Sequence, residues 1–126
     1  MPDSIIPFEL QDFIIRHIDS IAQIEALLLL RLHADQSWDV PKTAQRLYIS
    51  EQETLQILQN LCDDGLLECN DGLYRYACKS KEDEQFVDRL AESYARNLVA
   101  VTSIIHAKPR RIREFANAFK LRKDRG

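Results

Sequence analysis

The side chains best suited to recognising a partner molecule lie in residues 50–64, which we predict to form a helix. Carboxamides both donate and accept hydrogen bonds, and glutamine and asparagine pair in this way with the edge of adenine. The residues that we expect to face outward with an amide or hydroxyl group are Gln52, Thr54, Gln56, Gln59 and Asn60. This stretch therefore carries the polar groups needed to read base edges.

The same stretch contains no lysine or arginine, and Glu51 and Glu53 place negative charge at its start. Non-specific affinity for nucleic acid comes mainly from cations that neutralise phosphates. The basic residues that we expect to supply such contacts lie elsewhere in the chain: Lys42, Arg46, Lys79, Arg110, Arg111 and Arg113. Phosphate binding would thus depend on residues outside the helix that carries the carboxamides.

No residue pattern in the chain predicts catalysis, a cofactor or a metal site. The three glycines do not form a phosphate-binding loop, and nothing in the sequence brings serine, histidine and acidic residues together. The three histidines are scattered and share no ligand-like spacing with the cysteines. We therefore expect a protein that is not an enzyme and holds no cofactor.

The three cysteines do not predict a disulfide. An odd number of cysteines without close spacing is a poor disulfide framework. Cys62 lies on the apolar side of its predicted helix and is expected to be a small core residue. Cys69 lies in the hairpin described below, with Cys78 out of its reach.

Two short helices joined by a tight turn position the candidate residues. Asp39 caps the first predicted helix, which has Pro41 in its first turn, and residues 48–50 make the turn. Ser50 and Glu53 form a capping box that satisfies backbone amides at the start of the second helix.

The second helix is followed by a predicted β-hairpin. Gly65 ends the helix, and residues 70–72, Asn-Asp-Gly, are a strong hairpin signal. With a two-residue turn, Glu68 and Arg75 face each other across the two strands. The apolar residues that repeat at helical spacing before the hairpin are Leu55, Leu58, Leu61 and Cys62.

This order of elements resembles the winged helix-turn-helix superfamily of bacterial transcription regulators. The similarity covers roughly residues 20–79 and is most specific from Ile49 to Leu67, together with the wing-like hairpin. The resemblance implies that residues 50–64 enter the major groove of DNA. The sequence departs from the superfamily at residues 55–57, Leu-Gln-Ile, where DNA-binding relatives typically carry serine and arginine.

Two further helices are predicted before this motif. The first begins near Pro7 and reaches about His17, and the second runs from Ile21 to about Ala34. The second is apolar on nearly all sides, which places it at the centre of the fold, covered by neighbouring elements or by a second subunit.

Residues 82–107 are patterned as one long helix after the hairpin. At 1.5 Å per residue it would extend about 39 Å, which is longer than the preceding domain needs to cover its core. It either folds back across its own domain or joins two subunits, and two-fold dimers are common in the superfamily. The residues that we assign to dimerisation are Phe86, Leu90, Tyr94, Leu98, Val101 and Ile105.

The end of the chain is strongly basic. Residues 108–126 contain eight basic and two acidic residues, whereas the rest of the chain has a net charge of −9. Pro109 ends the long helix, and residues 110–120 are predicted to form a short amphipathic helix. This tail could pack on the protein itself, on a partner, on nucleic acid or, least favourably, on an anionic membrane.

The 126 residues thus predict a mainly α protein with a small β-hairpin, in three parts. Residues 1–81 form a winged helix-turn-helix domain with an N-terminal helical extension, 82–108 a dimerisation helix, and 109–126 a basic tail. The longest apolar run, Ala26 to Leu30, is too short to cross a bilayer, and the chain begins without a basic leader region. We therefore expect a cytoplasmic protein without a membrane segment.

Two functions fit these patterns. The first is a dimeric transcriptional regulator that binds DNA through residues 50–64 and the basic residues named above. The second is a protein-interaction module with little or no DNA binding, in which Leu55 and Ile57 contact another protein and acidic side chains guide a basic partner.

Overall fold

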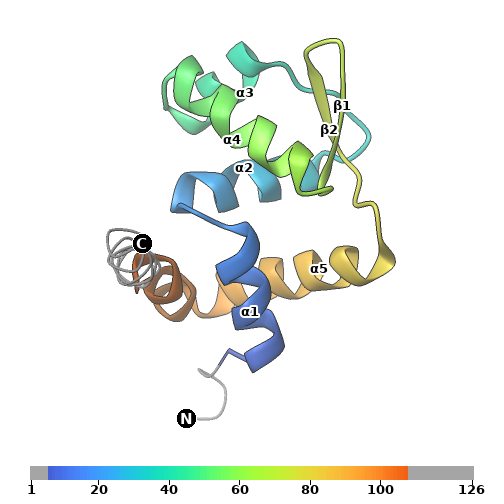
Figure 1. Cartoon of the computed structure of the whole chain (residues 1–126). Coiled ribbons are helices and arrows are strands. Elements are labelled where there is room, and N and C mark those ends of the chain that lie inside the picture. The colour runs from blue at the N-terminus through green and yellow to red at the C-terminus, as the bar shows by residue number, and fades with distance from the viewer. Residues whose placement is uncertain (1–5, 108–126) are drawn as a thin grey trace, which may run out of the picture.

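The computed structural model describes residues 6–107 and shows a mainly helical protein with one small antiparallel sheet (Figure 1). In chain order the elements are α1 (Phe8–His17), α2 (Ile21–Leu32), α3 (Val40–Leu47), α4 (Glu51–Asp63), β1 (Leu67–Asn70), β2 (Leu73–Tyr76) and α5 (Lys81–Arg96). Residues 98–107 form a further helical segment after α5. The expectation of a mainly α protein with a β-hairpin is confirmed.

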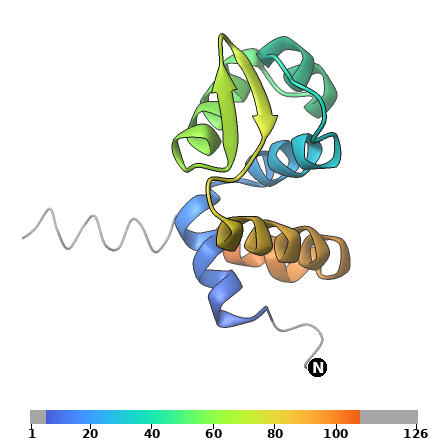
Figure 2. The same cartoon turned by 90° about the vertical axis from the view of Figure 1, so that its right-hand side faces the viewer.

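The elements form two layers on either side of α2. Helices α3 and α4 and the hairpin lie above α2 in Figure 1, whereas α1, α5 and residues 98–107 lie below it, an arrangement that the rotated view in Figure 2 also shows. Helix α2 contacts α3, α4 and β2, while α1 contacts α5. Helix α2 is thus central, as predicted, and the elements that cover it belong to the same chain.

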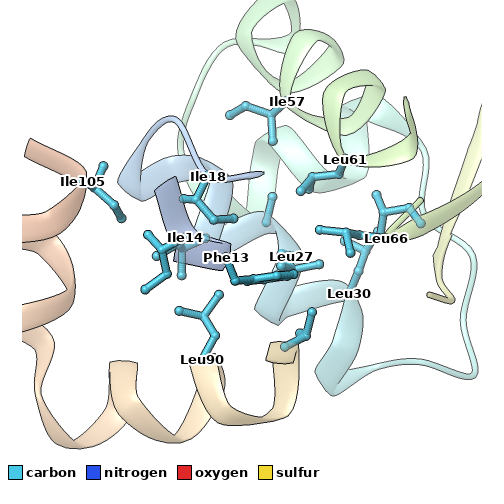
Figure 3. Packing of buried hydrophobic residues seen from close by; sticks show 14 of the residues in the cluster. Phe13, Ile14, Ile18, Leu27, Leu30, Ile57, Leu61, Leu66, Leu90 and Ile105 are labelled. Atoms are coloured by element: carbon cyan, nitrogen blue, oxygen red, sulfur yellow. The ribbon is translucent and has the colours of Figure 1, made fainter. Parts of the chain in front are cut away.

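One apolar core joins the two layers. Phe13 of α1, Leu27 of α2, Leu61 of α4 and Leu90 of α5 are all fully buried in the same cluster (Figure 3). The ring of Phe13 stacks on that of Phe86, with centroids 5.2 Å apart. Because each helix contributes one apolar stripe to this shared core, the two layers depend on one another for stability.

Side chains cap α3 and α4 as expected. The Asp39 carboxylate accepts a hydrogen bond of 2.8 Å from the amide of Lys42, and Ser50 Oγ accepts one of 3.0 Å from the amide of Glu53. Between the helices, Tyr48 adopts a left-handed conformation with φ of 59°. The tight turn predicted between the two helices is therefore present.

The end of α4 leads directly into the hairpin. Gly65 has φ of 80°, and the amides of Gly65 and Leu66 donate to the carbonyls of Cys62 and Leu61. This pair of hydrogen bonds is the Schellman arrangement, which satisfies the last carbonyls of a helix. The predicted stop at Gly65 is confirmed.

The hairpin has the predicted register. Glu68 pairs with Arg75 across the strands, and the guanidinium donates to the carboxylate at 2.7 Å. Trp38 adds a short antiparallel bridge to the outer side of β2, through two 2.7 Å hydrogen bonds with Tyr74. None of the sequence patterns predicted this bridge.

The prediction of one continuous helix over residues 82–107 is wrong. Asn97, with φ of −131° and ψ of 59°, leaves the helical region and ends α5. The amide of Val101 bonds to the carbonyl of Asn97, so a new helical segment starts there. The break lets the chain turn back toward α1, which brings Val101 and Ile105 into the core.

The six residues assigned to dimerisation have different environments. Leu90, Val101 and Ile105 are buried in the core of their own chain, and Phe86 and Tyr94 are partly buried against it. Leu98 alone among the six is exposed, with 51% of its surface accessible. Most of this stripe is thus used inside the chain.

Candidate interaction face

Four side chains form the outer surface of α4, and we call them the α4 face: Gln52, Leu55, Gln56 and Gln59. Their spacing of three, four and seven residues from the first places them on one side of the helix. All four are exposed, as expected for the three glutamines. Leu55 repeats at helical spacing with the apolar residues of α4 and was also assigned to a partner contact; half of its surface is accessible, as that contact requires.

Two residues expected to face outward point into the core instead. Thr54 is fully buried, and its hydroxyl donates to the carbonyl of Ser50 at 2.8 Å. Ile57 is only 6% exposed and belongs to the same buried cluster as Leu61 (Figure 3). Burial of Thr54 rules out the base contact assigned to it, and burial of Ile57 rules out the partner contact assigned to it.

The amides beyond the first turn are already hydrogen-bonded along the helix. Gln56 donates to the side chain of Asn60 at 3.1 Å, and Gln59 donates to the carboxylate of Asp63 at the same distance. Such exposed pairs are weak, so a ligand could displace them. Asn60 is only partly exposed, which places it at the border of the α4 face.

A shallow hollow adjoins the α4 face at the turn between α3 and α4. Its volume is about 480 Å³, and its walls are Pro41, Ala44, Gln45, Tyr48, Ile49 and Glu51. Tyr48 stands at its border with 93% of its surface exposed. Glu51 closes one side of the hollow, and exposed Leu55 lies one helical turn further along the same side of α4.

The cations assigned to phosphate contacts have other neighbours. The ammonium of Lys42 lies 4.3 Å from the ring centroid of Trp38, and the guanidinium of Arg46 lies 5.5 Å from it. Both groups are at cation–π distance from the indole. The side chain of Lys79 approaches Gly65, and Arg110, Arg111 and Arg113 lie outside the described residues.

The charge of this region is negative. From Asp39 to Tyr76 the chain carries seven acidic and three basic residues. One of the three cations, Arg75, is paired with Glu68. A polyanion approaching the α4 face would therefore meet carboxylates at Glu51 and Glu53 and no opposing charge on the helix itself.

A disulfide joins α4 to the hairpin, contrary to expectation. Cys62 and Cys69 are bonded, with Cα atoms 6.2 Å apart. Cys62 is partly exposed rather than a core residue. Cys69 is paired with Tyr74 in the hairpin, and the packing of β1 on α4 brings Cys69 to the end of the helix.

Cys78 is a free thiol in a different environment. Its sulfur donates to the hydroxyl of Tyr76 at 3.4 Å. Partial burial raises the pKa of Cys78, and the carboxylates of Asp83 and Glu84 raise it further, against a lowering by the Tyr76 hydrogen bond. Burial and the bond with Cys78 also raise the pKa of Tyr76.

A metal site and a membrane-spanning helix each place requirements on the part of the chain that the structure describes. There, no three His, Cys, Asp or Glu side chains gather closely enough to hold a metal ion. Nor does any helix within residues 6–107 have the length and apolar composition that crossing a bilayer requires.

Comparisons with known proteins leave the chain without an assigned family. No protein-family model, no curated protein and no solved structure matches it.

Proposed function

We propose that the chain is a winged-helix protein-binding module whose α3–α4 region takes a basic, amphipathic segment of another protein. The order α3, turn, α4 and hairpin, with Trp38 bridging to β2, supports the winged-helix assignment. In this proposal the helix that reads DNA in regulators presents its outer surface to a protein instead.

The observation that carries the proposal is the pairing of exposed apolar groups with a carboxylate border. Tyr48 and Leu55 are exposed at one end of the molecule, and Glu51 and Glu53 lie between them in the sequence. Aromatic and aliphatic anchors within a polar border are the usual composition of a protein interface. The negative border favours a partner that carries lysine or arginine beside its apolar side chains.

DNA binding by a dimeric regulator is the second candidate, and one observation favours it. Gln52, Gln56 and Gln59 are exposed in a row along the α4 face, where each amide could pair with an adenine edge. This candidate needs phosphate contacts from Lys42, Arg46 and Lys79, and from the arginines at 110, 111 and 113.

Titration calorimetry with a synthetic helix that has lysines on one face and leucines on the other tests the protein-binding proposal. We expect the full chain to bind this peptide, and Leu55→Ser and Tyr48→Ser each to weaken binding by about tenfold, equivalent to about 1.4 kcal/mol. Leu98→Ser is the matched control, because Leu98 has nearly the same exposed fraction as Leu55 but lies in the other layer. Equal loss in the control would contradict the proposal.

Removing two negative charges from α4 distinguishes protein binding from DNA binding. Glu51→Gln combined with Glu53→Gln should weaken the peptide complex and reduce its salt dependence, because the carboxylates attract the lysines. The same double variant should instead strengthen binding to a fluorescent DNA duplex if α4 lies in the major groove. Duplex binding that weakens steeply with salt, and whose salt dependence falls when Arg110, Arg111 and Arg113 become Ala, would establish the second candidate.

A further inference from the structure

The junction between α4 and β1 carries a pair of cysteines that no function discussed above uses. Cys62 occupies the last turn of α4 and Cys69 lies in β1, and their Cα separation of 6.2 Å is within the ordinary range for a disulfide. Cys69 is exposed and Cys62 is partly exposed. The pair is thus at the surface, where a small thiol or disulfide can approach it.

The two residues are held close whether or not they are bonded. The Schellman turn at Gly65 reverses the chain after α4, and the amide of Leu66 bonds to the carbonyl of Leu61. Leu66 and Leu67, between the cysteines, are buried in the core and anchor the start of β1. Because hydrogen bonds and packing set this geometry, the two thiols of the reduced chain remain near bonding distance.

Cys78 is poorly placed to react with small thiols or disulfides. It is partly buried, its sulfur bonds to the hydroxyl of Tyr76, and its raised pKa leaves little reactive thiolate at neutral pH. Exchange should therefore be selective for the other two cysteines.

We propose that Cys62 and Cys69 form a reversible thiol–disulfide exchange site that takes low-molecular-weight disulfides of the glutathione class as its oxidant. The thiolate of exposed Cys69 attacks one sulfur of oxidised glutathione, forms a mixed disulfide and releases one glutathione thiolate. The thiolate of Cys62 then attacks the Cys69 sulfur and releases the second. The two thiol protons end on two molecules of reduced glutathione, and the reverse sequence reduces the protein.

The bond adds a covalent link between the last turn of α4 and the hairpin. In the oxidised chain the hairpin is tied to α4 through this bond as well as through packing, whereas in the reduced chain packing alone joins them. The proposal does not depend on what the α4 face binds, and its test reads only the state of the thiols.

Tryptic mapping of the full chain tests the proposal directly. Cleavage after Arg46 and Arg75 leaves Cys62 and Cys69 in one peptide, residues 47–75, and Cys78 in another, residues 76–79. The protein is equilibrated with mixtures of reduced and oxidised glutathione, quenched with acid and alkylated with iodoacetamide. As oxidised glutathione increases, peptide 47–75 should change from two alkyl groups to none, with the loss of two hydrogens. Peptide 76–79 should stay alkylated throughout.

Two variants check the assignment. Cys78→Ser should leave the transition of peptide 47–75 unchanged, and Cys69→Ser should leave one alkyl group or one glutathione on Cys62 without an internal bond. The proposal is overturned if the wild-type peptide stays doubly alkylated in every mixture, or if it stays bridged in excess reduced glutathione. A mixed disulfide with glutathione as the final oxidised product, or a bond that involves Cys78, would also overturn it.

Discussion

At the scale of single residues, Tyr48 combines an unfavourable backbone with an unused side chain. Its φ of 59° lies in the left-handed region, which costs a residue other than glycine about 1 kcal/mol or more. The residue is 93% exposed, so packing within the described chain offsets little of this cost. A tyrosine that costs stability and packs against little of its own chain is consistent with a role in binding a partner.

Tyr48→Gly should therefore separate stability from binding. Because glycine adopts positive φ without strain, we expect the free energy of unfolding to rise by about 1 kcal/mol in urea denaturation. The same variant should bind the lysine–leucine peptide about tenfold more weakly, since the aromatic anchor is lost. A variant that is more stable and binds equally well would leave Tyr48 without a role in the interface.

Tyr94 makes the other informative contact of a single side chain. Its hydroxyl donates to the carboxylate of Glu25, which links α5 to α2. Burial, followed by the bond with Glu25, raises the pKa of Tyr94 to about 12. The ordinary pKa of tyrosine is about 10, so the stability that goes with this raised pKa is fully present below pH ~10 and is lost as the pH rises through about 12.

Ultraviolet titration of tyrosinate should show this shift. In the wild-type chain we expect one tyrosine to ionise near pH 12, and Tyr94→Phe should remove that step from the curve. Tyr48→Phe serves as the control, because it removes an exposed tyrosine and should leave the step near pH 12 in place. A curve in which Tyr94→Phe leaves this step intact would show that the hydroxyl does not hold the Glu25 bond in solution.

At the scale of elements, the hairpin depends on the backbone of its turn. Asp71 and Gly72 have φ of 52° and 76°, and positive φ at both central residues is the pattern that matches the twist of paired strands. An added Cβ on Gly72 would meet no other atom within 4 Å. A substitution at Gly72 therefore tests backbone conformation without a steric clash.

Gly72→Ala should lower the free energy of unfolding by about 1 kcal/mol, measured by urea denaturation. The neighbouring exposed residue Asn70 has no positive φ, so Asn70→Ala should change stability by less than about 0.5 kcal/mol. Equal effects of the two substitutions would argue against the turn conformation described here.

At the scale of the whole molecule, the break at Asn97 assigns one apolar stripe to the core of the same chain. Leu90 and Val101, on either side of the break, are both fully buried. An ion pair of 3.0 Å between Arg31 and Asp88 adds a polar link between α2 and α5, although an exposed pair of this kind contributes little to stability. Apolar burial is therefore the main contribution to the packing of α5 on the rest of the protein.

Leu90→Ala should therefore destabilise the whole chain. We expect a loss of about 3 kcal/mol in urea denaturation, because a fully buried leucine is replaced by a cavity. Both layers share the core, so circular dichroism and tryptophan fluorescence of Trp38 should report one coincident transition. Two separate transitions would show that the layers fold independently.

Homodimerisation stays a prediction, and it now depends on fewer residues. Leu98 and its neighbour Val99 are exposed, whereas the other five residues assigned to a dimer are buried or partly buried. Leu98→Asp should lower the dimer fraction in sedimentation velocity while changing the free energy of unfolding by less than about 0.5 kcal/mol. An unchanged sedimentation coefficient would exclude Leu98 from any subunit interface.

The parts of the fold that sequence alone predicts are those decided by short-range interactions. The caps at Asp39 and Ser50 and the stop at Gly65 each depend on hydrogen bonds within a few residues. The same is true of the hairpin, whose register follows from its two-residue turn and places Glu68 opposite Arg75. Such features can be predicted from local sequence because their partners are neighbours in the chain.

Tertiary packing decided what periodicity could not. Leu55 and Thr54 are neighbours on α4, and the packing of this helix on α2, α3 and β1 sets which of the two is buried. The turn at Asn97 likewise depends on contacts with elements far away in the sequence, and the Cys62–Cys69 bond depends on how β1 packs on α4. An apolar stripe indicates that a helix surface will be covered, but the covering element, in the same chain or in another, is chosen by the free energy of packing the complete core.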